Sequence, residues 1–194
     1  MAERPVLIYL HGFKSSPQAL KAQEVAAYIA SRELAVDYRQ PALPDLPDQA
    51  FTLLKTMMDG LKGRKVALIG SSLGGFYATW LAETYDVKAV LVNPAVRPHE
   101  LMQKYLGINE NPYSGVQFEL TPLHMETLQS HYLKDFRQPS RFLLLLQTGD
   151  EVLDALEASA RFSASPCMIE AGGDHRFQHF ERYLPRVFAW LDLE

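Results

Sequence analysis

The sequence predicts an α/β protein with a mostly parallel sheet and helices on both of its faces, and three observations support this. Five short runs of residues are almost wholly apolar, as strands covered on both faces must be. Longer segments between them carry apolar residues at helical spacing. Strand and helix patterns alternate along the chain, which is typical of parallel sheets with right-handed crossovers.

Six strands are expected. The five apolar runs are residues 6–10, 66–69, 89–92, 142–146 and 167–169. The sixth, residues 34–41, alternates apolar with polar side chains and ends at a proline, which favours the edge of the sheet. Because Cys167 falls within a strand, it is expected to be a small core residue.

Helices are expected between these strands. Apolar stripes with the spacing of one buried helix face run through residues 22–29, 50–57 and 184–191. Ser16 followed by Pro17 is typical of a helix start, so the first helix is expected to begin there.

Residues 97–138 interrupt the alternation. They contain no strand-like run and are too many for a simple connection, so we expect an insertion of short helices, one of them starting at Thr121 and Pro122. The chain, residues 1–194, is thus expected to be one domain with a lid-like helical insertion.

Composition excludes several functional classes. The formal net charge is −4 with no basic cluster, so nucleic acid is not an expected partner. A single cysteine cannot form an internal disulfide, and no apolar segment has the length of a signal peptide, so a cytoplasmic location is expected. The longest purely apolar run, residues 142–146, is far too short to span a membrane.

The stretch "GSSLGG" indicates a nucleophilic serine. Residues 70–74 match Gly-x-Ser-x-Gly between a predicted strand and a predicted helix, where a tight turn exposes the serine hydroxyl. The register selects Ser72, because Ser71 would need a glycine where Ile69 stands. The alternatives are a plain tight turn or a dinucleotide-binding loop, but the glycine spacing of that loop is absent.

A nucleophilic serine needs a base and a group that orients the base. Asp150 and His175 follow the strands predicted at residues 142–146 and 167–169, and therefore lie at the same sheet edge as Ser72. Their order in the chain, Ser, Asp, His, is that of α/β-hydrolases.

Other residues could take these roles. Glu151 or Asp154 could replace Asp150 as the acid, and His175 could be a plain surface residue. His179 lies one helical turn after His175 and suggests a metal pair, but no third ligand accompanies it. We therefore expect no metal or other cofactor.

Two backbone amides are expected to bind the oxyanion. The amide of Leu73 follows the nucleophile at a helix start, where N–H groups are free. The second is assigned to Phe13, after Gly12 in the loop that follows the first strand. His11 is expected to support this loop through hydrogen bonds.

Four motifs in this order, "YLHGFKSSP", "GSSLGGF", "QTGDEVLD" and "GGDHRFQHF", resemble the small bacterial esterases of the YqiA type, within the α/β-hydrolase superfamily. The resemblance covers nearly the whole chain and implies a serine carboxylester hydrolase with Ser72, Asp150 and His175 as its triad. It also implies a trimmed six-stranded sheet that lacks the two strands usually opening this fold, with the order 2-1-3-4-5-6.

The expected substrate is a small ester with a short to medium acyl chain. Apolar residues of the insertion, among them Met102, Tyr105, Tyr113 and Met125, could wall an acyl pocket or equally pack onto the core. A thioester such as acyl-coenzyme A is the nearest enzymatic alternative. A catalytically silent binding protein is the alternative from another class.

Overall fold

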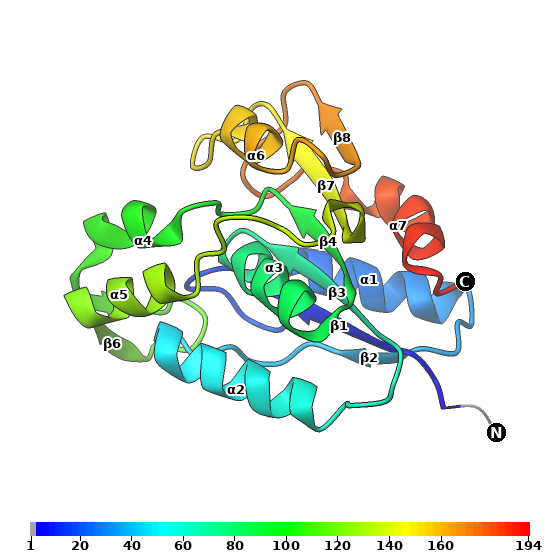
Figure 1. The fold of residues 1–194 in the computed structure, drawn as a ribbon, viewed down its shortest axis with the longest axis horizontal. Helices are drawn as coiled ribbons and strands as arrows, with labels where there is room; N and C mark the ends of the chain where they lie inside the picture. Colours follow the sequence, from blue (N-terminus) through cyan, green and yellow to red (C-terminus); the bar gives the residue numbers. More distant parts are fainter. Residues whose placement is uncertain (1–2) are drawn as a thin grey trace.

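Six parallel strands form one sheet in the computed structural model, which describes residues 3–194 (Figure 1). They are β1 (Val6–Leu10), β2 (Asp37–Arg39), β3 (Val66–Ser71), β4 (Lys88–Val92), β7 (Phe142–Gln147) and β8 (Cys167–Glu170). Their order is β2-β1-β3-β4-β7-β8, and each neighbouring pair is parallel. The predicted strands and their predicted order are confirmed.

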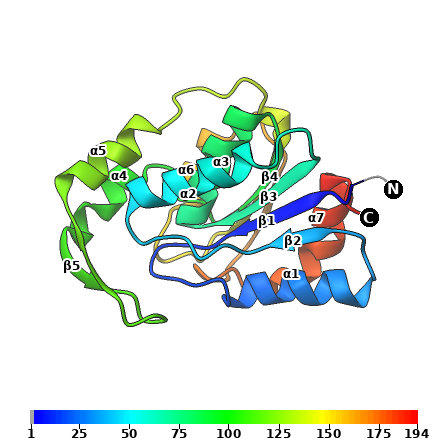
Figure 2. The same ribbon diagram turned by 90° about the horizontal axis from the view of Figure 1, so that it is seen from below.

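Helices cover both faces of this sheet (Figure 2). On one face lie α1 (Leu20–Ser31) and α7 (Leu184–Leu191), the latter preceded by the 3-10 turn η3 (Phe180–Tyr183). On the other lie α2 (Pro47–Asp59), α3 (Leu73–Tyr85) and α6 (Ala155–Arg161). A short turn, η2 (Pro139–Arg141), leads into β7.

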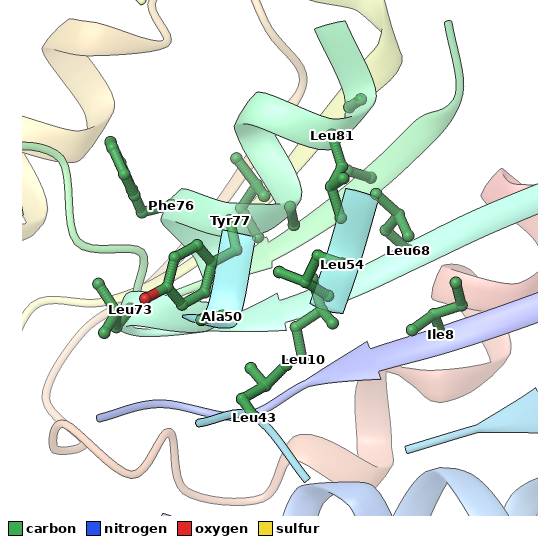
Figure 3. Packing of buried hydrophobic residues seen from close by; sticks show 14 of the residues in the cluster. Ile8, Leu10, Leu43, Ala50, Leu54, Leu68, Leu73, Phe76, Tyr77 and Leu81 are labelled. Carbon is green, nitrogen blue, oxygen red and sulfur yellow. The ribbon is translucent and has the colours of Figure 1, made fainter. Parts of the chain in front are cut away.

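The two faces bury separate hydrophobic clusters. Along β1, Ile8 and Leu10 belong to the cluster under α2 and α3, whereas Leu7 and Tyr9 belong to the cluster under α1 and α7. Figure 3 shows the first cluster, in which side chains of both helices meet those of β1 and β3. Burial on both sides explains why the central strands are continuous apolar runs.

The start of α1 differs from the prediction. The helix begins at Leu20, not after Ser16. Ser16 instead forms a turn of its own, in which its hydroxyl accepts from the Gln18 amide (3.2 Å) and its carbonyl accepts from the Ala19 amide (3.1 Å). Serine followed by proline suits such a turn as well as it suits a helix cap.

The predicted all-helical insertion is also wrong in part. Residues 97–138 contain α4 (Pro98–Leu101), η1 (Met102–Tyr105) and α5 (Pro122–Ser130), but also an antiparallel hairpin of β5 (Gly107–Glu110) and β6 (Gln117–Leu120). These strands have mixed composition because much of their surface is exposed. The segment lies beyond the ends toward which the parallel strands run (Figure 2).

Cys167 is exposed, contrary to the expectation of a core position. It lies on β8, an edge strand whose side chains alternate between partly covered and exposed. Within residues 3–194, no helix is both long and apolar enough to cross a membrane.

Candidate active site

Ser72 lies in a tight turn between β3 and α3. Its backbone has φ 56° and ψ −122°, a conformation that residues with a side chain rarely adopt. The turn is held by hydrogen bonds, since the Ser72 amide donates to the Val92 carbonyl (3.1 Å) and the Ser72 carbonyl accepts from the amides of Gly75 (2.9 Å) and Ala95 (3.0 Å). The strained serine thus lies at the carboxyl end of a central strand.

Two glycines allow the backbones around this turn to approach closely. A Cβ atom on Gly74 would collide with the Leu10 carbonyl oxygen at the end of β1, and one on Gly70 would collide with the Gly74 carbonyl. The first turn of α3 therefore packs directly on two strand ends. This is the local reason for glycine on each side of the serine.

Of the three side chains predicted as a triad, His175 lies within hydrogen-bonding distance of both Ser72 and Asp150. The His175 Nε2 atom is 3.1 Å from the Ser72 Oγ atom. On the other side of the ring, Nδ1 is 2.9 Å and 3.0 Å from the two carboxylate oxygens of Asp150. The imidazole is therefore bracketed by a hydroxyl and a carboxylate.

Asp150 is fixed from several sides. Its side chain is only 2% exposed, and its Oδ1 atom accepts from the amides of Val152 (2.8 Å) and Leu153 (2.9 Å). Burial is the largest single influence on its pKa and raises it, but the bond to His175 and the two amides together bring the pKa below the ordinary 3.8. Asp150 thus carries a negative charge at neutral pH next to the Nδ1 atom of the His175 ring.

The alternative residues have other partners. Glu151 accepts from the backbone amide of His175 (3.0 Å), and Asp154 caps α6 by accepting from the Leu156 amide (2.8 Å). His179 is about half exposed, with its Nδ1 atom 3.7 Å from Glu181. None of these three side chains bonds to the His175 ring among the described hydrogen bonds.

Two buried polar residues that the sequence reasoning did not single out hold the His175 loop. The Gln147 side chain, on a residue 1% exposed, accepts from the amides of Asp174 (3.2 Å) and Gln178 (2.8 Å). Asn93 donates to the Asp174 carbonyl (3.0 Å) and accepts from the Gln147 amide (3.0 Å). The sequence does contain a signal for Gln147 and Asn93. Each is a polar residue directly after a buried strand run, and such a residue needs buried hydrogen-bond partners.

His11 supports the loop after β1, as expected. Its Nε2 atom accepts from the Leu43 amide (3.0 Å), so Nδ1 carries the proton and donates to the Gly12 carbonyl (2.9 Å). Burial lowers the pKa of His11, which favours this neutral form. The imidazole thereby ties the loop containing Phe13 to the segment after β2.

An apolar cavity of about 190 Å³ opens beside Ser72 and His175. Phe13 and Leu73, whose amides are the predicted oxyanion donors, both line it. Leu73 is the first residue of α3, where an amide has no acceptor within the helix. The remaining walls come mainly from the insertion and the loops beside it, namely Ala95, Pro98, Leu101, Met102, Tyr105 and Val152.

Two of the four residues suggested for an acyl pocket line the apolar cavity, and two do not. Met102 and Tyr105 line the apolar cavity, and the centroids of the Phe13 and Tyr105 rings are 5.3 Å apart. Met125 is instead buried in the core, because it faces inward from α5. Tyr113 is 66% exposed on the turn of the hairpin and borders a different, more polar cavity near Ser72.

Comparison with known proteins gives the family and the fold. The profile of the uncharacterised protein family UPF0227 matches residues 6–192. A UPF0227 protein of Serratia proteamaculans is 24% identical over 97% of this chain and 99% of its own length. No activity is named in either description.

Several solved structures have similar folds, and two of them are Est1E and a mouse protein. Est1E from Butyrivibrio proteoclasticus, solved with ferulic acid bound, has a TM-score of 0.71 at 17% identity and covers 98% of this chain and 88% of its own. Alpha/beta hydrolase domain-containing protein 10 from mouse has a TM-score of 0.73 at 17% identity, covering 99% and 92%. At these identities the likeness concerns the fold.

Proposed function

The chain belongs to the uncharacterised protein family UPF0227 and has the α/β-hydrolase fold, and from the geometry of its own residues we infer that it is a serine hydrolase of carboxylic esters. One observation carries this proposal. The two nitrogens of His175 lie within hydrogen-bonding distance of Ser72 on one side and Asp150 on the other. This is the arrangement by which an imidazole activates a serine hydroxyl.

In the proposed acylation step, Ser72 Oγ attacks the ester carbonyl carbon while His175 Nε2 takes the hydroxyl proton. The ionised Asp150 stabilises the positive imidazolium and holds its tautomer through Nδ1. The tetrahedral intermediate then collapses. The carbon–oxygen bond to the alcohol breaks, and the leaving alcohol takes the proton from Nε2.

Deacylation repeats these steps with water. His175 removes a proton from a water molecule that attacks the acyl-enzyme, and it returns that proton to Ser72 as the carboxylic acid leaves. The amides of Phe13 and Leu73 are proposed to bind the oxyanion in both steps, each contributing roughly 3 kcal/mol in comparable sites. Both residues border the cavity that contains Ser72, which supports this assignment.

The apolar cavity supports a short to medium acyl chain. Its volume of about 190 Å³ is below the roughly 300–1,000 Å³ of ordinary ligand pockets. The same residues could cleave a thioester, because attack and collapse differ only in the leaving atom. Matched oxygen and sulfur esters therefore belong in the test.

Burst kinetics with chromogenic esters of increasing acyl length test the proposal. We expect a burst of released alcohol close to one equivalent where deacylation is slower, and hydrolysis that is best with short to medium acyl chains. Ser72→Ala should lower kcat by a factor on the order of 10⁶. His175→Asn should cause a comparable loss, because the serine then has no base.

His179→Asn is the matched control, since this exposed histidine lies four residues farther along the same loop region. It should retain wild-type kinetics. Folded wild-type protein that turns over no oxygen ester or thioester would contradict the proposal and favour a binding protein. Retention of activity in Ser72→Ala would contradict the assigned nucleophile.

A further inference from the structure

A second cavity meets the apolar one at the candidate catalytic residues. Its volume is about 260 Å³. It shares Phe13, Ser72 and His175 with the apolar cavity. Its other walls come from β1 and the loop after it, the end of β3, the start of α1, the loop after β8 and the hairpin turn that carries Tyr113. The Ser72 hydroxyl and the His175 ring therefore stand between two cavities of different chemistry.

The second cavity is cationic. Lys14, Lys21 and Arg176 line it, and no aspartate or glutamate is among its lining residues in the described part of the chain. This composition contrasts with the apolar cavity, whose lining holds no lysine or arginine within the same residues. We call the second one the cationic cavity.

Three carboxylates close to the cationic cavity accept hydrogen bonds from neighbouring groups. Asp150 is bonded to His175, and Asp174 accepts from the Arg176 amide (2.9 Å) and the Gln178 side chain (3.0 Å). Asp45 borders the neighbouring cavity and accepts from Asn111 (2.9 Å and 3.0 Å). These carboxylates and Glu24, which also acts on Lys21, offset part of the positive charge, but the lining itself holds three cationic side chains and no carboxylate within the described residues.

Lys21 is held in place at this wall. It extends from the first turn of α1, and its Nζ atom donates to the Arg176 carbonyl in the loop that carries His175. Burial lowers the pKa of Lys21 to about 8, despite the opposing effect of nearby acidic groups. A partly buried ammonium of this kind is stabilised by a bound anion.

Lys14 lines the cationic cavity from a strained position in the loop after β1. It has φ 52°, a left-handed conformation that is unfavourable for a residue with a side chain. It immediately follows Phe13, the proposed oxyanion donor. Backbone strain of this type concentrates at functional sites.

We propose that the cationic cavity binds a negatively charged group on the leaving part of the substrate, while the apolar cavity takes an uncharged acyl chain. The substrate class is then an ester or thioester whose alcohol or thiol carries a carboxylate or phosphate. This inference rests on the proposed hydrolase function. The leaving group must depart beside His175, which protonates it, and the cationic cavity is the polar space that adjoins that ring.

Three esters with similar leaving phenols test the inference, with the spontaneous hydrolysis of each measured and subtracted. The first is the butyrate ester of 4-hydroxyphenylacetate, whose leaving group is anionic, and the second is the same ester of 4-hydroxyphenylacetamide, which is neutral. The third carries the carboxylate on the acyl chain, as the glutarate monoester of 4-hydroxyphenylacetamide. We expect kcat/KM to be about tenfold or more higher for the first than for the second, because bonds to charged groups contribute this much.

The variant Lys14→Gln/Arg176→Gln should reduce the ratio of kcat/KM between the first and second esters toward one. Arg186→Gln, an exposed arginine on α7, is the control and should leave that ratio unchanged. Equal kcat/KM for the first two esters in the wild type, or a preference for the third, would overturn the inference while leaving the hydrolase function intact. Failure of all three esters to react would overturn both.

Discussion

Ser72 holds a positive φ of 56° although it carries a side chain, and conformations of this kind cost of the order of 1–3 kcal/mol. Backbone hydrogen bonds between Ser72 and Val92, Gly75 and Ala95 hold the turn and so stabilise this conformation. The Ser72 Oγ atom therefore lies at the end of β3, 3.1 Å from the His175 Nε2 atom. Strain in one residue thus supports the proposed reaction.

Asp150 should make stability depend on pH. Its pKa in the folded protein is below the ordinary 3.8, so the unfolded chain binds the proton more tightly than the fold does. The ionised carboxylate therefore stabilises the fold fully above its unfolded pKa, and this contribution is lost as the pH falls through the folded pKa. Asp150→Asn removes the contribution.

We expect the difference in unfolding free energy between wild type and Asp150→Asn to be largest near neutral pH and to shrink below about pH 4. Urea unfolding at a series of pH values measures it. Glu126→Gln, at an exposed carboxylate on α5, controls for the loss of one negative charge. A difference that stays constant from neutral to acid pH would show that the bond to His175 does not stabilise the ionised carboxylate.

Among the elements, the crossing of α3 over the ends of β1 and β3 determines where the nucleophile lies. Gly74 is at this crossing, with no space for a Cβ atom beside the Leu10 carbonyl. The sequence alone predicted a tight turn here from the Gly-x-Ser-x-Gly pattern. It could not predict which backbone atoms meet, because that depends on how strands distant in the chain pair.

Gly74→Ala should therefore both destabilise the protein and reduce hydrolysis, since α3 must shift and carry Ser72 with it. Overpacking of this kind costs typically about 1–3 kcal/mol, measurable by urea unfolding. Gly60→Ala is the matched control, because a Cβ atom there would make only ordinary contacts of 3.5 Å and 3.6 Å. Wild-type stability and activity in Gly74→Ala would refute the close crossing.

The sequence was informative about some elements and not others for two physical reasons. Strands buried on both faces must be apolar throughout, so the central strands were evident. The hairpin of β5 and β6 has exposed positions and no such run, and it was missed. The start of α1 was misplaced because serine followed by proline also forms a simple turn.

For the whole molecule, the parallel sheet gathers the candidate site at one edge. Ser72 follows β3, Asp150 follows β7 and His175 follows β8, so three loops distant in the chain meet where the strands end. Their convergence could be predicted from the sequence because parallel strands share the direction of their ends. The supports given by Gln147 and Asn93 could not, because their partners come from loops whose paths the pattern does not define.

The candidate site is divided into an apolar and a cationic cavity. The insertion supplies part of the apolar cavity, whereas the start of α1 and Tyr113 of the insertion supply part of the cationic cavity. Sequence patterning identified the apolar residues of the insertion but not their placement, so Met102 lines the site whereas Met125 lies in the core.

The most direct test of the central claim, that Ser72 is an activated nucleophile, is reaction of the folded protein with a fluorophosphonate followed by peptide mass mapping. We predict one phosphonyl adduct on Ser72 that is absent in His175→Asn and present in His179→Asn. An adduct on another residue, or no adduct on folded wild-type protein, would contradict the claim.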